Sequence, residues 1–291
     1  MGKNSYREVL ARASSFLEQN QLEGHMIEYV FLQRKHWNKT DYLLHMHETI
    51  TAEDQKQIDE DMAKLLAHYP PQYLIGSEVF LDYRLKVTPD TLIPRPETEE
   101  LVEKCLTLTQ KQANQALKVV DVGTGTGAIA ISLKDKRPTW QVSAVDLSAA
   151  ALEVAKENAQ QIGVALEFIL SDCLDEVAGP IDVLISNPPY ISQDEYELMD
   201  VSVCQFEPKM ALFAENNGLA IYEKLAQQAP SKLAKDGKIF LEIGFMQGPA
   251  VKELFQAAFP KKQVSIHQDL FGNDRMIVVD KWITFPHDVD K

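Results

Sequence analysis

Cysteine is scarce in this sequence, and long apolar runs are missing from it. Its 291 residues include three cysteines, Cys105, Cys173 and Cys204, which lie far apart and form no CxxC pair. Such spacing predicts neither a disulfide framework nor a zinc site, and it fits a reducing cytoplasm. No apolar run approaches the roughly 20 residues that span a bilayer, and the polar start MGKNSYREVL does not resemble a signal peptide. We therefore expect a cytoplasmic protein without membrane association.

Positive charge is also in short supply. The sequence has 29 Lys and Arg residues against 43 Asp and Glu residues, which gives a formal net charge of -14 and a pI near 5.0. Proteins that grip nucleic-acid phosphates need clustered Lys and Arg, so direct binding of nucleic acid is not expected. An acidic surface favours solubility and can also steer a basic partner. His45 and His47 diverge on a helix at their two-residue spacing, so no metal site is expected either.

Apolar residues, at 45%, are plentiful enough to build the core of a globular protein. Residues 1–72 are expected to form a helical domain. The stretch Ser5 to Glu8 has the pattern of a helix-capping box, and Thr51 begins another helix whose apolar stripe runs from Ile58 to Tyr69. Pro70-Pro71 is expected to stop that helix.

Residues 73–95 are expected to form a hairpin linker, because apolar residues alternate there from Val79 to Val87. Residues 96–291 then alternate between helices and strands, and they end in an antiparallel hairpin around Phe271. This order predicts an α/β domain with a mostly parallel, doubly wound sheet and helices on both faces.

A glycine-rich loop follows the first buried strand of this α/β domain. It reads DVGTGTG from Asp121 to Gly127, and Asp146 ends the next strand. Glycines allow a tight turn and a close approach of backbone to ligand, and a strand-end carboxylate can accept hydrogen bonds from both ribose hydroxyls. The spacing is GxGxG and not the GxGxxG of dinucleotide enzymes, which favours a compact anionic group over a pyrophosphate. S-adenosylmethionine combines an adenine, a ribose and such a group, its amino-acid carboxylate.

A second motif, SNPPYISQDEY, begins at Ser186 after a later apolar strand. Pro188 and Pro189 lack backbone N–H groups and fix their own φ at about -65°, and each pushes the residue before it into an extended conformation. We therefore expect residues 187–190, the NPPY segment, to be stiff, with bare carbonyls, the amide side chain of Asn187 and the ring of Tyr190. Such a segment can accept two hydrogen bonds from an NH2 group and pack against its plane.

Four further stretches narrow the interpretation. They read PPQYLIG (residues 70–76), LIPRPETE (92–99), EIG followed by Gln247 (242–247) and DLFGNDR (269–275). Together with the glycine loop and the NPPY segment, over roughly residues 68–280, they resemble the peptide chain release factor glutamine N5-methyltransferases, the PrmC or HemK family. NPPY alone is shared with adenine and other amine methyltransferases.

The resemblance implies a Rossmann-like, seven-stranded class I methyltransferase sheet (residues 96–291) and a small helical domain that docks the substrate (1–72). It implies methyl transfer from S-adenosylmethionine, which leaves S-adenosylhomocysteine, to the glutamine of the Gly-Gly-Gln motif in peptide chain release factors 1 and 2. By this resemblance, donor contacts come from Gly123, Thr124, Gly125, Thr126, Gly127, Asp146, Asp172, Cys173 and Asn187. The glutamine is held by Asn187, Pro188, Pro189 and Tyr190, of which Asn187, Pro188 and Tyr190 form the catalytic set.

Some interpretations stay open at the level of sequence. Asp172 can accept a hydrogen bond from the adenine amine or can cap a turn, and Cys173 stands where some relatives carry a tryptophan. Arg95 and Glu97 are candidate neighbours of the site, whereas Glu242 is expected to be structural. Two rival functions remain: N6-adenine methylation of nucleic acid, which the acidic charge disfavours, and an NAD-dependent dehydrogenase or non-catalytic nucleotide-binding module. A monomer is expected.

Overall fold

The structure, a computed structural model, describes residues 4–282 of the chain. It divides into two compact units. The first consists of Met1–Glu78 together with Asp200–Phe206, and the second of Val79–Met199 together with Glu207–Lys291. In the sequence, residues 200–206 lie between the two parts of the second unit. By their contacts they belong to the first unit.

The first unit is helical, as the sequence predicts. Its helices are α1 (Tyr6–Gln19), α2 (His25–Lys35), α3 (Lys39–His45), α4 (Ala52–Leu66), α5 (Pro71–Ile75) and α9 (Val201–Phe206). The capping box at Ser5 is present, with the Ser5 side chain accepting from the Glu8 N–H and the Glu8 carboxylate accepting from the Ser5 N–H. Thr51 caps α4 through the N–H of Asp54 at 3.0 Å. The helices enclose a core that includes Leu10, Leu17, Ile27, Val30, Ile58 and Leu65.

One helix boundary differs from the expectation. α4 ends at Leu66, four residues before Pro70, and His68 adopts a left-handed φ of 61°. Pro71 instead occupies the first turn of α5, where a missing N–H costs nothing. The prolines therefore begin the next helix and do not end α4. The ring of Tyr69 packs on that of Phe206, with centroids 5.0 Å apart.

A two-stranded hairpin follows, formed by β1 (Ser77–Phe80) and β2 (Tyr83–Lys86). The apolar alternation slips by one residue at its turn, because Leu81 has a left-handed φ of 50°. Val79 is therefore 49% exposed, while Phe80 takes the buried place and Leu85 on β2 is fully buried. The hairpin prediction is confirmed, but the apolar alternation expected from Val79 to Val87 is interrupted at the turn.

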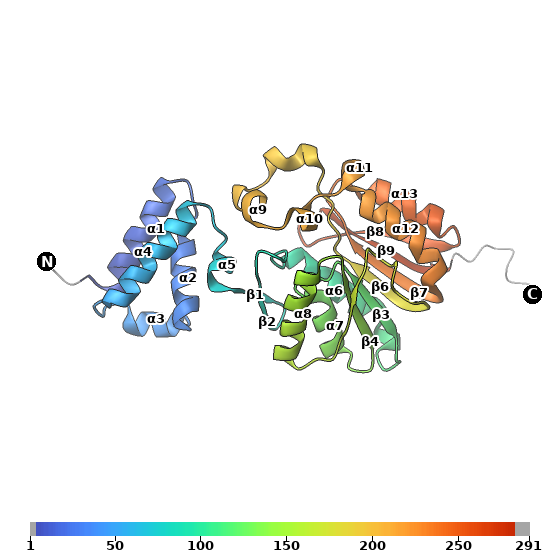
Figure 1. Cartoon of the computed structure of the whole chain (residues 1–291), viewed down its shortest axis with the longest axis horizontal. Helices are drawn as coiled ribbons and strands as arrows, with labels where there is room; N and C mark the ends of the chain where they lie inside the picture. The colour runs from blue at the N-terminus through green and yellow to red at the C-terminus, as the bar shows by residue number, and fades with distance from the viewer. Residues whose placement is uncertain (1–3, 283–291) are drawn as a thin grey trace, which may run out of the picture. The chain divides into compact units, whose positions relative to one another are not determined.

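The second unit contains a seven-stranded sheet in the order β5-β4-β3-β6-β7-β9-β8 (Figure 1). Pairing is parallel from β5 to β7, and β9 runs antiparallel to both β7 and β8. This is the mostly parallel, doubly wound sheet that the sequence predicts. The strands are β3 (Lys118–Val122), β4 (Gln141–Asp146), β5 (Glu167–Leu170), β6 (Ile181–Ser186), β7 (Leu233–Glu242), β8 (Lys262–Gln268) and β9 (Asp274–Trp282).

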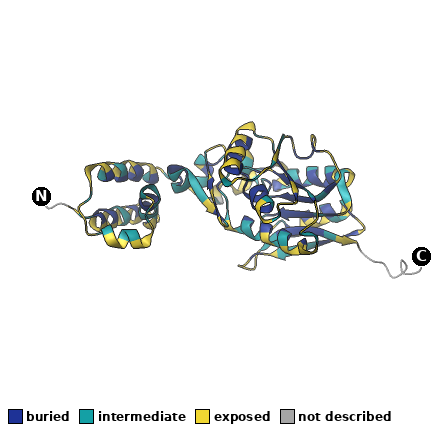
Figure 2. Ribbon diagram, turned by 90° about the horizontal axis from the view of Figure 1, so that it is seen from below, coloured by how far each residue is buried: buried dark blue, intermediate teal, exposed yellow. Residues whose placement is uncertain are grey.

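Helices cover both faces of this sheet. One face packs on α6 (Pro96–Leu108), α7 (Ala128–Lys136) and α8 (Ala149–Ile162), and the other packs on α12 (Ala220–Lys232) and α13 (Gly248–Ala258). Figure 2 shows the strands buried between helices whose outer sides are exposed. Burying both faces explains why consecutive residues of β3 (119–122) and β6 (183–186) are buried without alternation. Short helical turns complete the unit: η1 (Gln110–Gln112), η2 (Gln193–Leu198), α10 (Lys209–Leu212) and α11 (Glu215–Gly218).

The strand order reverses between β3 and β6, and this reversal positions the site. From β3 the chain proceeds outward to β4 and β5, then returns to place β6 on the other side of β3. Loops leaving β3 and β6 at such a point diverge to opposite faces and open a crevice at the carboxyl ends of the strands. The glycine loop leaves β3, and the NPPY segment leaves β6. Two motifs more than 50 residues apart in sequence, and flanking adjacent strands, thus meet at one edge.

Candidate active site

A cavity lies at this edge of the sheet, within the second unit. The carboxyl ends of β3, β4, β5 and β6 all contribute to it. Its lining consists of Asp90, Thr91, Leu92, Val122, Gly123, Gly125, Asp146, Leu147, Ser148, Ala151, Ser171, Asp172, Cys173, Ser186, Asn187, Pro188, Pro189, Met210, Ala211 and Ile221. Eight of the residues singled out in the sequence are in this lining: Gly123, Gly125, Asp146, Asp172, Cys173, Asn187, Pro188 and Pro189. Thr124, Thr126, Gly127 and Tyr190 are not.

Backbone hydrogen bonds hold the glycine loop. The N–H groups of Gly123 and Thr124 both donate to the Val145 carbonyl, at 2.8 and 2.9 Å. Gly123, Gly125 and Gly127 all have left-handed φ angles, between 53° and 82°. A side chain built on Gly125 would meet no atom within 4 Å, so the loop presents bare backbone to the cavity at this residue. The loop therefore lets a ligand approach its peptide groups closely.

The threonines of the loop are buried and serve its structure. Thr124 donates its hydroxyl to the Asp121 carboxylate at 2.7 Å, and the Thr126 carbonyl accepts from the Asn158 side chain at 2.9 Å. Burial raises the pKa of Asp121 to about 7, although the hydrogen bonds from Thr124 and the Ala130 N–H oppose the shift. Asp121 thus stabilises the loop through the hydrogen bond that it accepts from Thr124.

Asp146 ends β4 and faces the cavity. Its Oδ2 accepts from the Gly125 N–H at 2.9 Å, and its Oδ1 accepts from the Ser148 N–H at 2.9 Å. Burial raises the pKa of this carboxyl, while the N–H groups of Ser148 and Gly125 lower it. Two bonds leave about half of the acceptor capacity of a carboxylate free. The carboxylate is thereby fixed in orientation and can still accept two ligand hydroxyls.

Asp172 and Cys173 form the wall beyond β5. The Asp172 carboxylate pairs with Lys224 on α12 at 2.8 Å, and half of its side chain remains exposed. Cys173 is buried with a left-handed φ of 54°, and burial raises the pKa of its thiol to about 12. The thiol is therefore protonated and acts as a small apolar surface. The lysine pairing of Asp172 is a contact that neither open interpretation included.

The NPPY segment begins directly after β6. Ser186, the last residue of β6, donates its hydroxyl to the Val122 carbonyl at 2.6 Å and so ties the strand end to β3. Asn187 donates through Nδ2 to the hydroxyl of Thr98 at 3.0 Å. Within residues 4–282, neither the Asn187 side-chain oxygen nor the Pro188 carbonyl has a hydrogen-bond donor. Two acceptors thus lie unused on residues that line the cavity.

Tyr190 packs beside the sheet, next to the apolar cluster of α12 and α13. Its carbonyl accepts from the Gln247 side chain at 2.9 Å, and the same side chain accepts from the Gly244 N–H at 3.0 Å. Gly218 closes the other side, because a side chain there would stand 2.0 Å from the Tyr190 carbonyl oxygen. Burial raises the pKa of Tyr190 to about 12, so its hydroxyl is neutral.

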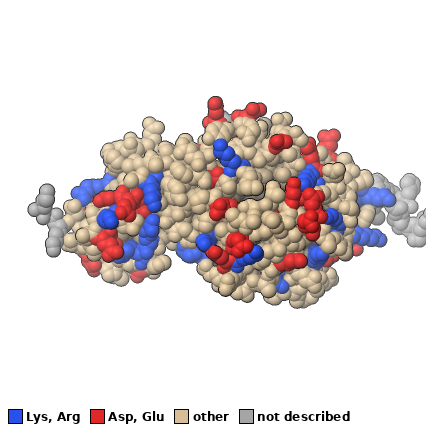
Figure 3. Space-filling view, in the orientation of Figure 1, with Lys and Arg blue, Asp and Glu red and all other residues tan. Residues whose placement is uncertain are grey.

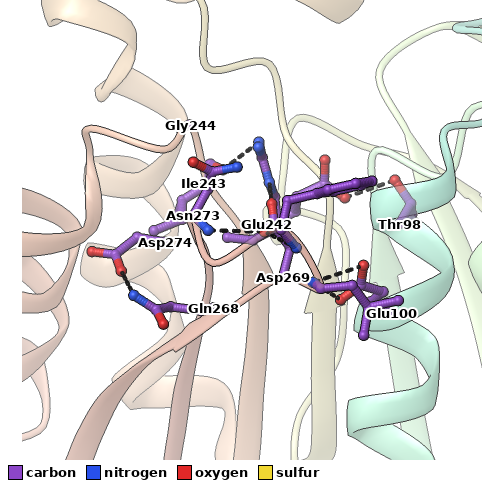
Figure 4. Close-up of polar contacts among 12 residues, drawn as sticks. Thr98, Glu100, Glu242, Ile243, Gly244, Gln268, Asp269, Asn273 and Asp274 are labelled. Atoms are coloured by element: carbon purple, nitrogen blue, oxygen red, sulfur yellow. Dashed lines mark hydrogen bonds and ion pairs between the residues drawn. The ribbon is translucent and has the colours of Figure 1, made fainter.

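A buried acid, Glu242, is linked to Asn187 through the hydroxyl of Thr98. Thr98, on the first turn of α6, donates its hydroxyl to Glu242 at the end of β7 at 2.7 Å, as Figure 4 shows. Glu242 is 2% exposed, and burial raises its pKa to about 7. The Tyr222 hydroxyl donates to the Glu242 backbone carbonyl at 2.7 Å. Glu242, expected to be structural, therefore connects through one hydroxyl to a residue that lines the cavity.

Sequence reasoning missed part of the cavity. Asp90, Thr91 and Leu92 come shortly before the PRPE stretch (residues 94–97), whose Arg95 does not line the cavity but pairs with the buried Glu207. Glu207 also accepts from the Ile93 N–H at 3.0 Å. Glu97 lies in the first turn of α6 and is not part of the lining. The sequence motif LIPRPETE did indicate that this part of the chain lies near the site. The residues that line the cavity, however, are Leu92 and the two residues before it, and not Arg95 or Glu97.

Of the two histidines weighed as metal ligands, His45 has local partners. His45 contacts Glu48 at 2.9 Å, and its ring stacks on Trp37 with centroids 4.9 Å apart. Over residues 4–282 no group of His, Cys, Asp and Glu side chains is arranged to hold a metal ion. No helix in the same range combines the length and the apolar character needed to cross a membrane.

Solved structures share the fold of this chain over most of its length. A methyltransferase from Pyrococcus furiosus superimposes with a TM-score of 0.52, covering 77% of this chain and 100% of its own at 16% identity. The 16S rRNA N2 G1207 methyltransferase of Thermus thermophilus, in complex with AdoMet and guanosine, gives 0.51 over 70% of this chain and 49% of its own, also at 16% identity. The sheet order, the glycine loop after β3 and the acid ending β4 define the class I methyltransferases.

Sequence comparisons give the family within this class. Residues 102–205 match the Methyltransferase small domain, and residues 8–76 match the PrmC N-terminal domain. A release factor glutamine methyltransferase of Enterococcus faecalis is 55% identical over 94% of this chain and 99% of its own. Those of Lactococcus lactis and Staphylococcus aureus are 51% and 35% identical, over 87% and 96% of this chain and 93% and 99% of their own. The chain belongs to the release factor glutamine methyltransferase family.

S-adenosylmethionine is therefore the methyl donor, and the cavity fits it. Gly125 leaves open space where any other residue would project a side chain, and Asp146 keeps free acceptors for a ribose. Apolar side chains of Leu92, Leu147 and Ile221 line the remainder of the cavity, as an adenine ring requires.

Proposed function

We propose that this enzyme methylates the side-chain amide nitrogen, N5, of the glutamine in the Gly-Gly-Gln motif of peptide chain release factors 1 and 2. One observation carries the choice of acceptor. The Asn187 side-chain oxygen and the Pro188 carbonyl are unused acceptors on residues that line the same cavity as the glycine loop. A carboxamide NH2 offers two donors in one plane, which two such acceptors can hold together. The family to which the chain belongs supports the same substrate.

The proposed roles follow the two sides of the cavity. Residues 123–127 and Asp146, with Asp172, Cys173 and Asn187, contact the donor. Residues 187–190 hold the glutamine, and Asn187, Pro188 and Tyr190 form the catalytic set. Tyr190 is the least direct of these, because its ring is outside the cavity lining and must contact the glutamine plane from the side.

Orientation is the main contribution of these residues to catalysis. A carboxamide nitrogen is a weak nucleophile because its lone pair is delocalised into the carbonyl, and it becomes acidic only as the new N–C bond forms. The donor supplies an electrophilic methyl group. Asn187 and Pro188 hold both N–H bonds, which leaves the lone pair of the nitrogen, perpendicular to the amide plane, to accept the methyl group. As the N–C bond forms, the bond from the methyl group to sulfur breaks, S-adenosylhomocysteine is left, and one N–H proton is lost to solvent. Positioning of this kind can lower a barrier by about 7–11 kcal/mol in favourable cases.

Each of the three predicted parts of the chain has its own role in this function. The helical domain, residues 1–72, docks the release factor, residues 73–95 link it to the catalytic domain, and residues 96–291 carry the chemistry. The enzyme works in the cytoplasm, as a monomer, without binding nucleic acid directly. Interspersed charge supports the last point, because Lys and Arg are mixed with Asp and Glu on the face drawn in Figure 3.

Mass spectrometry of a release factor after incubation with enzyme and S-adenosylmethionine tests the function. We expect one added methyl group, on the glutamine of Gly-Gly-Gln, and none on a release factor in which that glutamine is replaced by asparagine. Parallel incubations with DNA and with RNA cover the rival adenine activity. Methyl transfer to nucleic acid, or to another release factor residue, would contradict the proposal.

A further inference from the structure

Thr98 connects the NPPY segment to a buried acid, and neither the glycine loop nor the donor contacts account for it. Its side chain is 5% exposed on the first turn of α6. The Thr98 hydroxyl lies 3.0 Å from Asn187 Nδ2 and 2.7 Å from Glu242 Oε2. Asn187 and Thr98 are 89 positions apart in sequence, and Thr98 and Glu242 are 144 apart. Three parts of the chain that are far apart in sequence thus meet at one hydroxyl group.

The chemistry of a hydroxyl fixes the direction of both bonds. A hydroxyl has one hydrogen, and an ionised carboxylate can only accept. Thr98 must therefore give its hydrogen to Glu242, and only its lone pairs remain for Asn187. Asn187 can satisfy them only with its NH2 group, which turns its Oδ1 the other way. An asparagine side chain is otherwise nearly symmetric in shape and can rotate by 180°, exchanging oxygen and nitrogen.

We propose that Thr98 and Glu242 are positioning residues that set the amide orientation of Asn187, so that its oxygen and not its NH2 group faces the substrate. This inference rests on the proposed function, because the oxygen is needed only if the acceptor is an NH2 group. With the amide reversed, two NH2 groups would oppose each other and the glutamine would lose one of its two holds. Thr98 and Glu242 act through Asn187 and do not touch the substrate.

The orientation depends on the charge of Glu242. A protonated Glu242 can donate to Thr98, whose hydroxyl is then free to donate to Asn187, and the reversed amide becomes possible. Burial raises the pKa of Glu242 to about 7, so this change falls near neutral pH. The charged and titratable groups that face Glu242 are Arg275 on β9, Arg95 and Glu97 at the start of α6, Tyr190 in the NPPY segment and Tyr222 on α12.

Three threonine variants test the inference by kinetics. T98V keeps the shape but removes the hydroxyl, and we expect kcat to fall about 10-fold to 100-fold, as for a misplaced reacting group. The dissociation constant for S-adenosylhomocysteine should change less than about twofold, since every proposed donor contact other than Asn187 is untouched. T98S should recover most of the lost turnover. T109V is the matched control, because Thr109 has a fully buried hydroxyl at the end of the same helix that bonds only to carbonyls of α6.

E242Q tests the dependence on charge. In the wild type, kcat should rise with pH through a limb near pH 7, where Glu242 becomes ionised. Glutamine does not titrate and can donate or accept, so E242Q should have a lower kcat at pH 8 and should lack this limb. A T98V variant with wild-type kcat, or an E242Q variant that keeps the limb, would overturn the inference.

A measurement without turnover separates this inference from the proposed function. In the 15N NMR spectrum of the labelled enzyme, the Asn187 side-chain NH2 signal, identified by its loss in N187A, should show one proton protected from solvent exchange. That protection should vanish in T98V and persist in T109V. If the wild type methylates no release factor, the proposed function fails while the NH2 signal still decides the orientation. Equal protection in T98V and the wild type would reject the relay whatever the activity.

Discussion

The glycine loop and the NPPY segment flank the same cavity, but different forces hold them. The glycine loop is held by its own backbone, through N–H groups that donate to the Val145 carbonyl and to Asp146. The NPPY segment has two prolines with no N–H to give, so distant side chains hold it, namely Thr98 and Gln247. A hydrogen bond from a side chain can be removed by substituting that one residue. Backbone hydrogen bonds remain after most substitutions, and they are disturbed mainly where a new residue cannot adopt the φ angle or its side chain blocks the loop.

This difference predicts separable defects. Changes on the glycine loop side should weaken donor binding and leave the geometry of the glutamine site intact. Changes on the NPPY side should mainly reduce turnover, because Asn187 is the one residue of that segment among the proposed donor contacts. N187A, D146N, G125A and G218A test whether the two sides fail independently, and an effect that crosses from one side to the other would weaken the comparison.

The largest effect is expected from N187A. This change removes the side-chain oxygen that we propose as an acceptor for the glutamine NH2 group, and we expect kcat to fall by about 100-fold or more, since one of two proposed positioning contacts is lost. Single-turnover kinetics with a release factor measures the loss. Circular dichroism and thermal unfolding should match the wild type, because Asn187 is only partly buried. Near-normal turnover in N187A would refute its assigned role.

D146N should give the largest defect on the opposite side. The carboxylate is expected to accept both ribose hydroxyls, and a hydrogen bond to a charged group contributes about 1.5–3 kcal/mol. Asparagine retains one acceptor oxygen, so we expect the donor dissociation constant to rise about 10-fold to 100-fold. Isothermal titration with S-adenosylhomocysteine measures it. At saturating donor, kcat should recover to near the wild-type value, and a kcat that stays low would show that the two sides are coupled.

Two glycine substitutions form a matched pair. Gly125 and Gly218 both have left-handed φ angles, 53° and 78°, so alanine suffers a similar backbone penalty at each. At Gly125 the new methyl group meets no atom within 4 Å, whereas at Gly218 it would stand 2.0 Å from the Tyr190 carbonyl oxygen. We expect G218A to be destabilised by about 1–3 kcal/mol more than G125A, the typical cost of overpacking.

Urea denaturation of both glycine variants measures that difference, and their functional defects should also diverge. G125A places a methyl group in the donor cavity and should raise the donor dissociation constant. G218A displaces the NPPY segment and should lower kcat instead. If both variants lose donor affinity equally, the segment and the loop are not independent.

The sequence predicted the glycine loop side better than the NPPY side, and the reason is physical. The left-handed backbone of the loop and the acid ending β4 depend on residues within 25 positions of each other, so local patterns reveal them. The supports of the NPPY segment come from residues 89 and 57 positions away, at Thr98 and Gln247, and only the folded sheet brings them together.

Smaller misses have the same origin. The end of α4 at Leu66 and the slipped alternation of the β1–β2 hairpin both follow single left-handed residues, His68 and Leu81, that are not glycine. Such a φ is uncommon in residues other than glycine, so the sequence around His68 and Leu81 does not predict it. The cavity residues Met210, on the short helix α10, and Ile221, at the start of α12, are brought to the site only by the tertiary fold.

A modest effect on stability is expected from E242Q, and it depends on pH. Burial raises the pKa of Glu242 from an ordinary value of 4.5 to about 7, so the folded state binds a proton more tightly than the unfolded state. The associated stabilisation is fully present below about pH 4.5 and is lost as pH rises through 7, by up to roughly 3 kcal/mol. Glutamine has no such loss.

Urea denaturation of E242Q and the wild type at pH 5 and pH 8 measures this difference. We expect E242Q to gain stability relative to the wild type as pH rises. Asp121, whose pKa is raised similarly, is present in both proteins and cancels in the comparison. A constant stability difference between the two pH values would show that Glu242 does not titrate in this range.

The smallest expected effect concerns the encounter with the release factor. The chain carries a net charge of -14, and a basic, RNA-binding partner would be steered toward it over distances near the Debye length, about 10 Å at 0.1 M salt and 3 Å at 1 M. Raising the salt from 50 mM to 500 mM should therefore increase KM for the release factor by about threefold to tenfold. KM for the donor should barely change, because hydrogen bonds inside a cavity hold that ligand and screening acts weakly there.

Steady-state kinetics at several salt concentrations distinguishes the effect on KM for the release factor from the effect on KM for the donor. If both KM values rise together, salt perturbs the cavity itself and steering is not the cause. If neither rises, the acidic surface serves only solubility, and docking depends on contacts that salt does not screen.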